Sequence, residues 1–222
     1  MKNHIHSVWP TKWLLALTGI AIASPALANP KLTVRAVLQM EQVEAVIHGD
    51  TARVSGSFRF DKVRGNPKDS GQIFFPVFCQ KGTSAALRNL DFRAKLNGHK
   101  ALSCGLVTNA PLSLPASDAY SVAWVLVTFP PQAFDTWRLD VSYEQELLND
   151  VFYYLPILGE ARQSQEPFEV RVKADRPIYA MGKAGGVITK GPNELLFMPA
   201  NLRPISVSTN PYEATQTVSL VT

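Results

Sequence analysis

The sequence predicts an all-β protein built as an antiparallel sandwich, and three observations lead to this class. Several segments alternate apolar and polar residues with a period of two, which is typical of a strand with one buried face. Turn signals such as residues 48–50 and the Asn97-Gly98 dipeptide recur often enough to separate about twelve short strands. No segment shows a convincing helical period, and the best helix candidate, residues 84–90, is at most two turns long.

Residues 53–61 show the alternation most clearly. One face of this predicted strand carries apolar residues or glycine and the other carries arginine or serine: Val54, Gly56, Phe58 and Phe60 against Arg53, Ser55, Ser57 and Arg59. Residues 137–144 and 168–173 repeat the pattern. Each of these strands is therefore expected to have one face in the core and one in water.

Three further segments are apolar on both faces: residues 73–79, 122–129 and 152–158. Such strands belong in the middle of a packed structure, which favours an immunoglobulin-like or larger sandwich over the alternative, a closed barrel. Pro76, Pro130 and Pro156 lie in or beside these segments, and proline donates no ladder hydrogen bond. We therefore expect these prolines at strand ends, at bulges or on an edge.

The N-terminal 28 residues predict a cleaved secretory signal. Lys2 and Lys12 precede an apolar run at residues 13–23, and Ala26-Leu27-Ala28 provides small residues for cleavage after Ala28. We therefore expect a periplasmic or extracellular protein of the bacterial envelope. No later window approaches 18 consecutive apolar residues, so no transmembrane segment is expected after cleavage.

Residues 29–222 are expected to form one sandwich domain, with a sub-boundary as an alternative near residues 109–118, where Pro and Ser are frequent. This part carries 20 Lys and Arg against 18 Asp and Glu, too small an excess to indicate nucleic-acid binding. The charges are uneven, because residues 29–117 hold 12 basic and 6 acidic side chains. Two interpretations remain: scatter over a solvated surface, or a basic end that meets an anionic envelope surface.

The two cysteines, Cys79 and Cys104, are expected to form one disulfide between strands in an oxidising compartment. A catalytic thiol would need a histidine base and an exposed sulfur of low pKa. After cleavage only His48 and His99 remain, each beside a turn glycine, so we expect no catalytic triad, no metal site and no cofactor.

An acidic row is the best enzymatic lead. Asp140, Glu144 and Glu146 fall on one face of the strand at residues 137–144 and its continuation. Residues at i and i+2 are about 7 Å apart along a strand, a separation that a glycosidase pair could use. The row also fits a solvated face with every carboxylate ionised, and calcium binding is a weaker alternative because calcium ligands usually come from loops.

Aromatic residues offer a second lead. Tyr120 and Trp124 lie on one face of their predicted strand, and Tyr153 lies on the opposite face from its neighbours. Tyrosine and tryptophan are common anchors in sugar and protein binding, although in a sandwich they are more often core.

The run Val151-Phe152-Tyr153-Tyr154-Leu155-Pro156 resembles a strand motif of the periplasmic pilus-assembly chaperones, as do the length, the signal peptide and the β character. The resemblance implies two immunoglobulin-like domains and a role in assembling subunits. The acidic and asparagine positions of the motif are not reproduced, and the family's cleft arginine and lysine have no counterpart, so no functional residue is carried over.

The leading functional hypothesis is a non-enzymatic sandwich protein that acts through contacts with another envelope protein or surface component, to which a sheet edge could add a strand. One alternative is a carbohydrate-binding or glycoside-cleaving module that uses Glu144 and Glu146. The other is a periplasmic assembly chaperone. No nucleic acid is expected as a partner.

Overall fold

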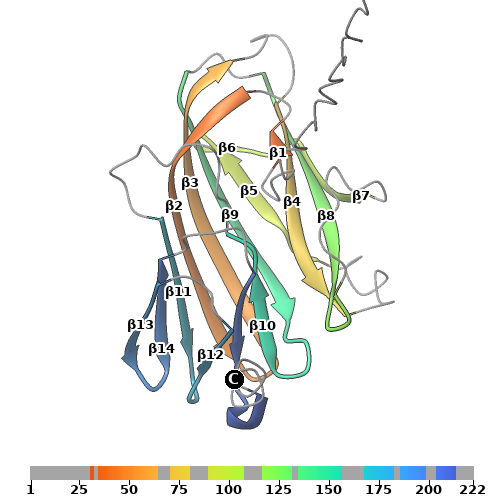
Figure 1. Cartoon of the computed structure of the whole chain (residues 1–222). Helices are drawn as coiled ribbons and strands as arrows, with labels where there is room; N and C mark the ends of the chain where they lie inside the picture. Colours follow the sequence, from red (N-terminus) through yellow and green to blue (C-terminus); the bar gives the residue numbers. More distant parts are fainter. Residues whose placement is uncertain are drawn as a thin grey trace, which may run out of the picture.

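The computed structural model confirms the all-β class (Figure 1). It describes residues 31–32, 35–64, 71–80, 90–107, 117–131, 135–156, 168–182, 186–198 and 204–213. These residues form fifteen strands, and residues 211–213 form one helical turn. The predicted signal peptide, residues 84–89 of the helix candidate and most of the linker-like segment lie outside the described residues.

The largest sheet has eight strands in the order β13-β14-β11-β2-β3-β9-β5-β6. Their bounds are β2 (Arg35–His48), β3 (Thr51–Arg64), β5 (Arg93–Leu96), β6 (His99–Lys100), β9 (Trp137–Glu146), β11 (Phe168–Ala174), β13 (Gly186–Gly191) and β14 (Glu194–Met198). Its central strands are the long hairpin β2–β3 and the neighbouring strand β9.

Two smaller sheets pack against the eight-stranded sheet. One has the order β1-β4-β8-β7, with the bounds β1 (Lys31–Leu32), β4 (Gly71–Cys79), β7 (Ser103–Val107) and β8 (Ser121–Phe129). The other has the order β10-β15-β12, with the bounds β10 (Val151–Tyr154), β12 (Tyr179–Met181) and β15 (Ile205–Ser208). Side chains from all three sheets meet in one buried apolar cluster, so the arrangement is a sandwich.

The strand pairs are antiparallel with one exception. β11 runs parallel to β2, with Val170 opposite Val43, and joins the second half of the chain to the first hairpin. The described strands form no closed barrel. The eight-stranded sheet also unites strands from residues 35–198, unlike the two immunoglobulin-like domains that the chaperone resemblance implies.

The predicted alternation is confirmed on β3 and β9. Within residues 53–60 and 137–143, the core-facing side chains are buried, whereas the intervening polar side chains are exposed or half-buried. The predicted type I′ turn between β5 and β6 is also confirmed, because Asn97 has φ 50° and Gly98 has φ 83°.

The prolines occupy the expected positions. Pro76 lies on β4 beyond Ile73 and Phe74, the two residues that pair with β1. Among the described strands, Pro76 is therefore paired on one side only, with β8. Pro130 directly follows β8, and Pro156 comes two residues after the end of β10. Strands that are apolar on both faces thus stop or lie on an edge where a proline occurs.

The chain passes from one layer of the sandwich to the other at residues 101 and 102. The Ala101 amide donates to the Ala94 carbonyl oxygen of β5 (3.1 Å), and the next amide, that of Leu102, donates to the Thr128 oxygen of β8 (2.7 Å). The chain therefore leaves the eight-stranded sheet at residue 101 and joins the four-stranded sheet at residue 102. This crossing places β7, and Cys104 with it, at the end of the β5–β6 hairpin. Among the described residues, no helix is long and apolar enough to cross a membrane.

Candidate functional site

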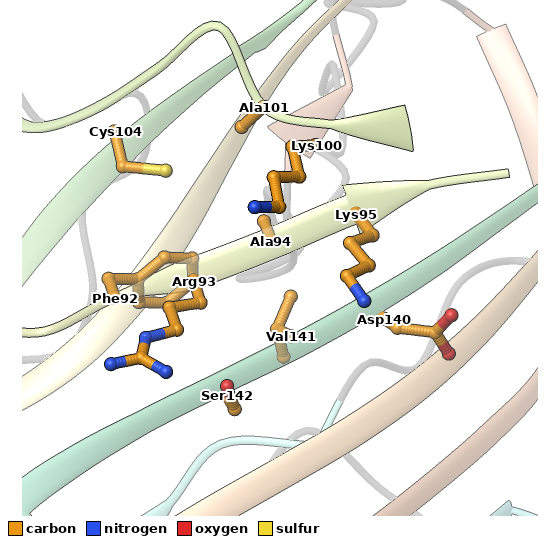
Figure 2. Close-up of a pocket in the computed structure, with 10 residues that line it drawn as sticks. All are labelled: Phe92, Arg93, Ala94, Lys95, Lys100, Ala101, Cys104, Asp140, Val141 and Ser142. Atoms are coloured by element: carbon orange, nitrogen blue, oxygen red, sulfur yellow. The ribbon is translucent and has the colours of Figure 1, made fainter. Parts of the chain in front are cut away.

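Two adjoining cavities form a polar groove on the eight-stranded sheet, and they share Asp140 and Val141 of β9. The first, of about 690 Å³, lies at the β5–β6 end (Figure 2). Its lining residues are Phe92, Arg93, Ala94, Lys95, Lys100, Ala101, Cys104, Asp140, Val141 and Ser142. The second, of about 490 Å³, extends toward β11, and its lining residues are Gln42, Val43, Glu44, Ser55, Gly56, Ser57, Asp140, Val141, Glu169 and Arg171. We call the two together the polar groove.

Short polar side chains in the middle of the sheet explain why the groove is hollow. Ser55 of β3 lies opposite Ser142 of β9, and Ser57 lies opposite Asp140. These residues alternate with the buried residues of the same strands, so their side chains are on the outer face. The outer-face residues on the neighbouring strands, such as Arg93 and Arg171, are longer. A row of serines between longer side chains leaves a depression.

The β5–β6 end of the groove is cationic. Lys95 and Lys100 are direct cross-strand partners, and both are exposed. Among the described residues, neither ammonium group has a carboxylate within the 4.0 Å of an ion pair. Figure 2 shows the Lys95 side chain extending from β5 toward Asp140, its partner on β9. Like charges directly opposite each other on a sheet destabilise it, so this pair is kept at a cost to the fold.

Arg93 contributes a third positive charge at the same end, but it is already paired. Its Nε donates to Asp91 Oδ1 at 3.0 Å and its Nη2 to Asp91 Oδ2 at 2.5 Å. The hydrogen bonds from Arg93 hold the pKa of the Asp91 carboxyl below its ordinary value. Among the described residues, the unneutralised positive charge at this end of the groove therefore belongs to the two lysines.

Asp140 lies where the two cavities meet. Ser57 Oγ donates to its Oδ1 at 2.8 Å, and Arg138 Nε donates to the same oxygen at 3.3 Å. Both contacts use one carboxylate oxygen, so Oδ2 has no hydrogen bond to a described residue. Asp140 can accept a hydrogen bond from a ligand in either cavity.

The other two residues of the predicted acidic row lie outside the groove. Glu144 accepts from Arg53 Nη2 at 2.8 Å and from Arg53 Nε at 3.1 Å on the open face of the sheet. Glu146 is exposed opposite Thr51 at the end of β9. Glu144 and Glu146, the pair predicted for glycoside cleavage, are two positions apart on β9, about 7 Å by strand geometry, but neither is among the described lining residues of the two cavities. Among the described residues, no three metal-binding side chains come together.

The predicted disulfide is absent from the structure, in which Cys79 and Cys104 are free thiols. The two cysteines lie on β4 and β7, on opposite sides of β8. Cys79 is in register with Ser121 and Cys104 with Val127, so the pair is offset by about 20 Å along β8. A disulfide needs Cα atoms within about 7 Å. The prediction was wrong because the number of residues between two cysteines does not determine the register of the strands that carry them.

Cys104 instead lines the cationic cavity as an exposed thiol. Partial burial of its sulfur raises the pKa of this thiol, so it stays protonated at neutral pH. Among the described lining residues there is no histidine to act as its base. The surroundings are those of an unactivated thiol rather than a nucleophile.

Two of the aromatic candidates come together, on the side of β4 away from the main core. The rings of Tyr120 and Tyr153 have centroids 4.9 Å apart, and both contact Phe78, at 4.9 Å and 5.8 Å. Trp124 is buried, with 2% exposure, and is no part of this cluster. The described lining residues of the polar groove, by contrast, include no tyrosine or tryptophan.

The groove lysines were missed at the sequence level. A search for acids and aromatics gave no reason to choose Lys95 or Lys100, although the alternation around Ala94 and Leu96 already placed basic residues on the outer face. The missing information was the pairing of β5 with both β6 and β9, which puts Lys95 between Lys100 and Asp140.

No protein-family model matches the chain, and no curated protein matches it. Among solved structures, a candidate nutrient-binding protein from Legionella pneumophila aligns with a TM-score of 0.45 and 13% identity over 82% of this chain and 68% of that one. Leukotriene A4 hydrolase from Saccharomyces cerevisiae gives 0.44 and 11% over 81% and 30%. An M1 zinc metallopeptidase from Deinococcus radiodurans gives 0.37 and 14% over 83% and 43%. This chain thus spans less than half of either enzyme, and none of these similarities carries a function to it.

Proposed function

We propose that this chain is an exported, non-enzymatic binding protein that holds an anionic group of a cell-envelope component at the cationic end of the polar groove. The observation that carries the proposal is the direct opposition of Lys95 and Lys100 in a cavity, without an ion-pair partner among the described residues. Export is proposed from the signal-like residues 1–28, with cleavage after Ala28.

An anionic ligand would offset the repulsion between the two lysines. A carboxylate or phosphate between the ammonium groups would make charge-assisted hydrogen bonds, which are about twice as strong as neutral ones. The hairpin also belongs to the basic half of the chain, because residues 29–117 carry twice as many basic as acidic side chains. The charge distribution would thus draw an anionic surface toward the groove.

A non-catalytic role is supported by the state of the reactive groups. Glu144 is neutralised by Arg53 on an open face, and Cys104 is an unactivated thiol. General acid–base chemistry needs a group whose pKa is tuned toward neutrality and that lies against the reacting bond. The described lining of the groove supplies hydrogen-bonding groups and charge, which suffice for binding.

Co-sedimentation of the mature chain, residues 29–222, with washed bacterial envelopes tests the proposal. Lys95→Ser/Lys100→Ser should reduce the bound fraction at low ionic strength, and added salt should reduce wild-type binding. The matched control, Arg53→Ser/Lys190→Ser, removes the same charge outside both cavities and should bind as wild type. Equal binding by wild type and the Lys95/Lys100 variant would refute the proposal. The two lysines would then serve to keep the edge of the hairpin from pairing with a strand of another chain.

Export is tested separately. The full chain expressed in a bacterium should appear in the periplasm or the medium, with Asn29 as its new N-terminus. Retention in the cytoplasm with residues 1–28 intact would contradict this part of the proposal.

A further inference from the structure

Building on the proposed binding role, we infer that the polar groove takes an acidic oligosaccharide, laid across six strands with its anionic end at Lys95 and Lys100. The two cavities share Asp140 and Val141, so one extended ligand could occupy both. The lining changes along this path, from lysines at β5 and β6 to serine, glutamine and carboxylates at β3, β2 and β11, where Arg171 is ion-paired with Glu194 at 3.6 Å.

The length of the groove indicates an oligomer rather than a single sugar. In the eight-stranded sheet its lining comes from β6, β5, β9, β3, β2 and β11, which are consecutive neighbours. Five spacings of about 4.8 Å give a path of about 24 Å, long enough for a chain of four pyranose units. A monosaccharide would fill one cavity and leave the other empty.

The side chains beyond the lysines match hydroxyl groups. Gln42 offers both a donor and an acceptor, as sugar hydroxyls do. The hydroxyls of Ser55 and Ser57 donate to the Glu44 carbonyl oxygen (3.5 Å) and to Asp140 Oδ1 (2.8 Å), and each can still accept a hydrogen bond from a sugar hydroxyl. Asp140 keeps Oδ2 without a hydrogen bond to a described residue, at the junction of the two cavities. A carboxylate oxygen in that position can accept from a hydroxyl, whereas it would repel a second anionic group. The ligand's negative charge is therefore expected at the lysine end.

An acidic peptide fits the groove less well. Peptides are usually held by a free strand edge or by pockets for apolar anchors. β9, β3, β2 and β11 are each paired on both sides, and the described end strand β6 has only two residues, so the described strands offer no long free edge. In the second cavity the apolar lining residues Val43 and Val141 are each 4% exposed, and in the first Phe92 and Ala94 are 8% and 6% exposed. These apolar residues are thus largely covered and give little surface for an apolar anchor.

Calorimetric titration of the mature chain with four defined probes tests the inference: glucuronosyl-maltotriose, whose single carboxylate is on a terminal sugar, glucuronate, the neutral maltotetraose and tetraglutamate. Glucuronosyl-maltotriose should bind most tightly, glucuronate about tenfold or more weakly, and maltotetraose and tetraglutamate weakest. Lys95→Ser/Lys100→Ser should weaken glucuronosyl-maltotriose binding about tenfold or more, because charge-assisted hydrogen bonds are lost. The control Arg53→Ser/Lys190→Ser should leave it unchanged.

A second variant probes the far end of the groove. Gln42→Ala/Ser57→Ala keeps the lysines and removes hydrogen-bonding groups from the second cavity. It should weaken glucuronosyl-maltotriose binding roughly threefold to tenfold and leave glucuronate binding unchanged, because the monomer does not reach that cavity. Circular dichroism and the thermal midpoint of each variant would show that it is folded.

The results separate this inference from the proposed function. Tetraglutamate binding that exceeds glucuronosyl-maltotriose binding would overturn the saccharide assignment while keeping the cationic site. Equal binding of maltotetraose would overturn the anionic requirement. No saccharide binding, combined with lysine-dependent binding to envelopes, would overturn the inference and retain the proposed function. Failure of both assays would overturn both.

Discussion

The hydroxyl of Tyr154 donates a 2.7 Å hydrogen bond to Oε1 of Glu41, a carboxylate with no exposed surface. Tyr154 lies on β10 of the three-stranded sheet and Glu41 on β2 of the eight-stranded sheet, so the bond ties the two layers together. The following core-facing residues of β2 are Val43, Ala45 and Ile47. An acid among apolar residues is costly unless hydrogen bonds hold it.

Tyr154→Phe should lower the free energy of unfolding by about 2 kcal/mol, because it removes a buried hydrogen bond to a charged group without removing the ring. Urea unfolding followed by fluorescence would measure the change. Tyr212→Phe is the matched control, since Tyr212 is 78% exposed, and it should change stability by less than about 0.5 kcal/mol. Equal effects of the two substitutions would show that the bond contributes nothing specific.

Stability should fall steeply in alkali. Burial, followed by the nearby charge of Glu41, raises the pKa of Tyr154 well above its ordinary value, and burial also raises that of Tyr143. The unfolded chain releases these protons near pH 10, whereas the folded chain retains them. Each tyrosine therefore contributes stability that is complete below pH 10 and falls above it by about 1.4 kcal/mol per pH unit.

Tyr143→Phe isolates this effect, because it keeps the ring that stacks on Phe92. Between about pH 10 and 11.5, the free energy of unfolding of the variant should fall less steeply with pH than that of the wild type. Urea titrations at each pH would measure it. An unchanged slope would mean that Tyr143 titrates in the folded state as it does in the unfolded chain.

The strands could be predicted from the sequence because each depends on a local pattern. The period of two on residues 53–61 is set by neighbours along the chain and by which face meets the core. The same pattern places Glu41 on the buried face with Val43 and Ala45, so a buried acid could be anticipated there although its charge argues against it. Turn chemistry at Asn97-Gly98 was equally local.

Pairing between distant strands could not be predicted in this way. The parallel pairing of β11 with β2, the opposition of Lys95 to Asp140 and the separation of Cys79 from Cys104 all depend on register between segments far apart in sequence. Such register is chosen by packing of the whole core rather than by either strand alone. The candidate site is a product of register, which is why composition and spacing identified only Asp140 in it.

Gly56 is expected to resist substitution because a ring lies directly over it. A Cβ atom at this position would come within 2.9 Å of Phe58 Cε2, and Val141 lies at 3.4 Å on the neighbouring strand. Both neighbours are buried, so Gly56→Ala should destabilise the fold by about 1–3 kcal/mol. Gly105→Ala on β7 meets no atom within 4 Å and should be neutral or slightly stabilising. Thermal unfolding of both variants would check the contrast, and a neutral Gly56→Ala would show that the ring moves aside freely.

The two thiols should differ in reactivity and should both be reduced. Cys104 is exposed and Cys79 is buried on β4, where its Sγ lies 3.6 Å from the Ser121 carbonyl oxygen. A thiol reagent should therefore label one cysteine in the native chain and two in urea, and Cys104→Ser should abolish only the native reaction. Burial of Cys79 and partial burial of the Cys104 sulfur raise the pKa of both thiols, so labelling of Cys104 should be slow at pH 7 and accelerate toward pH 9, as the thiolate forms.

The absence of a disulfide can be checked by mass spectrometry. The chain purified without reductant should gain no mass when it is reduced. A gain of two hydrogen atoms would show that Cys79 and Cys104 form a disulfide, which would require a register between β4, β8 and β7 unlike the one described.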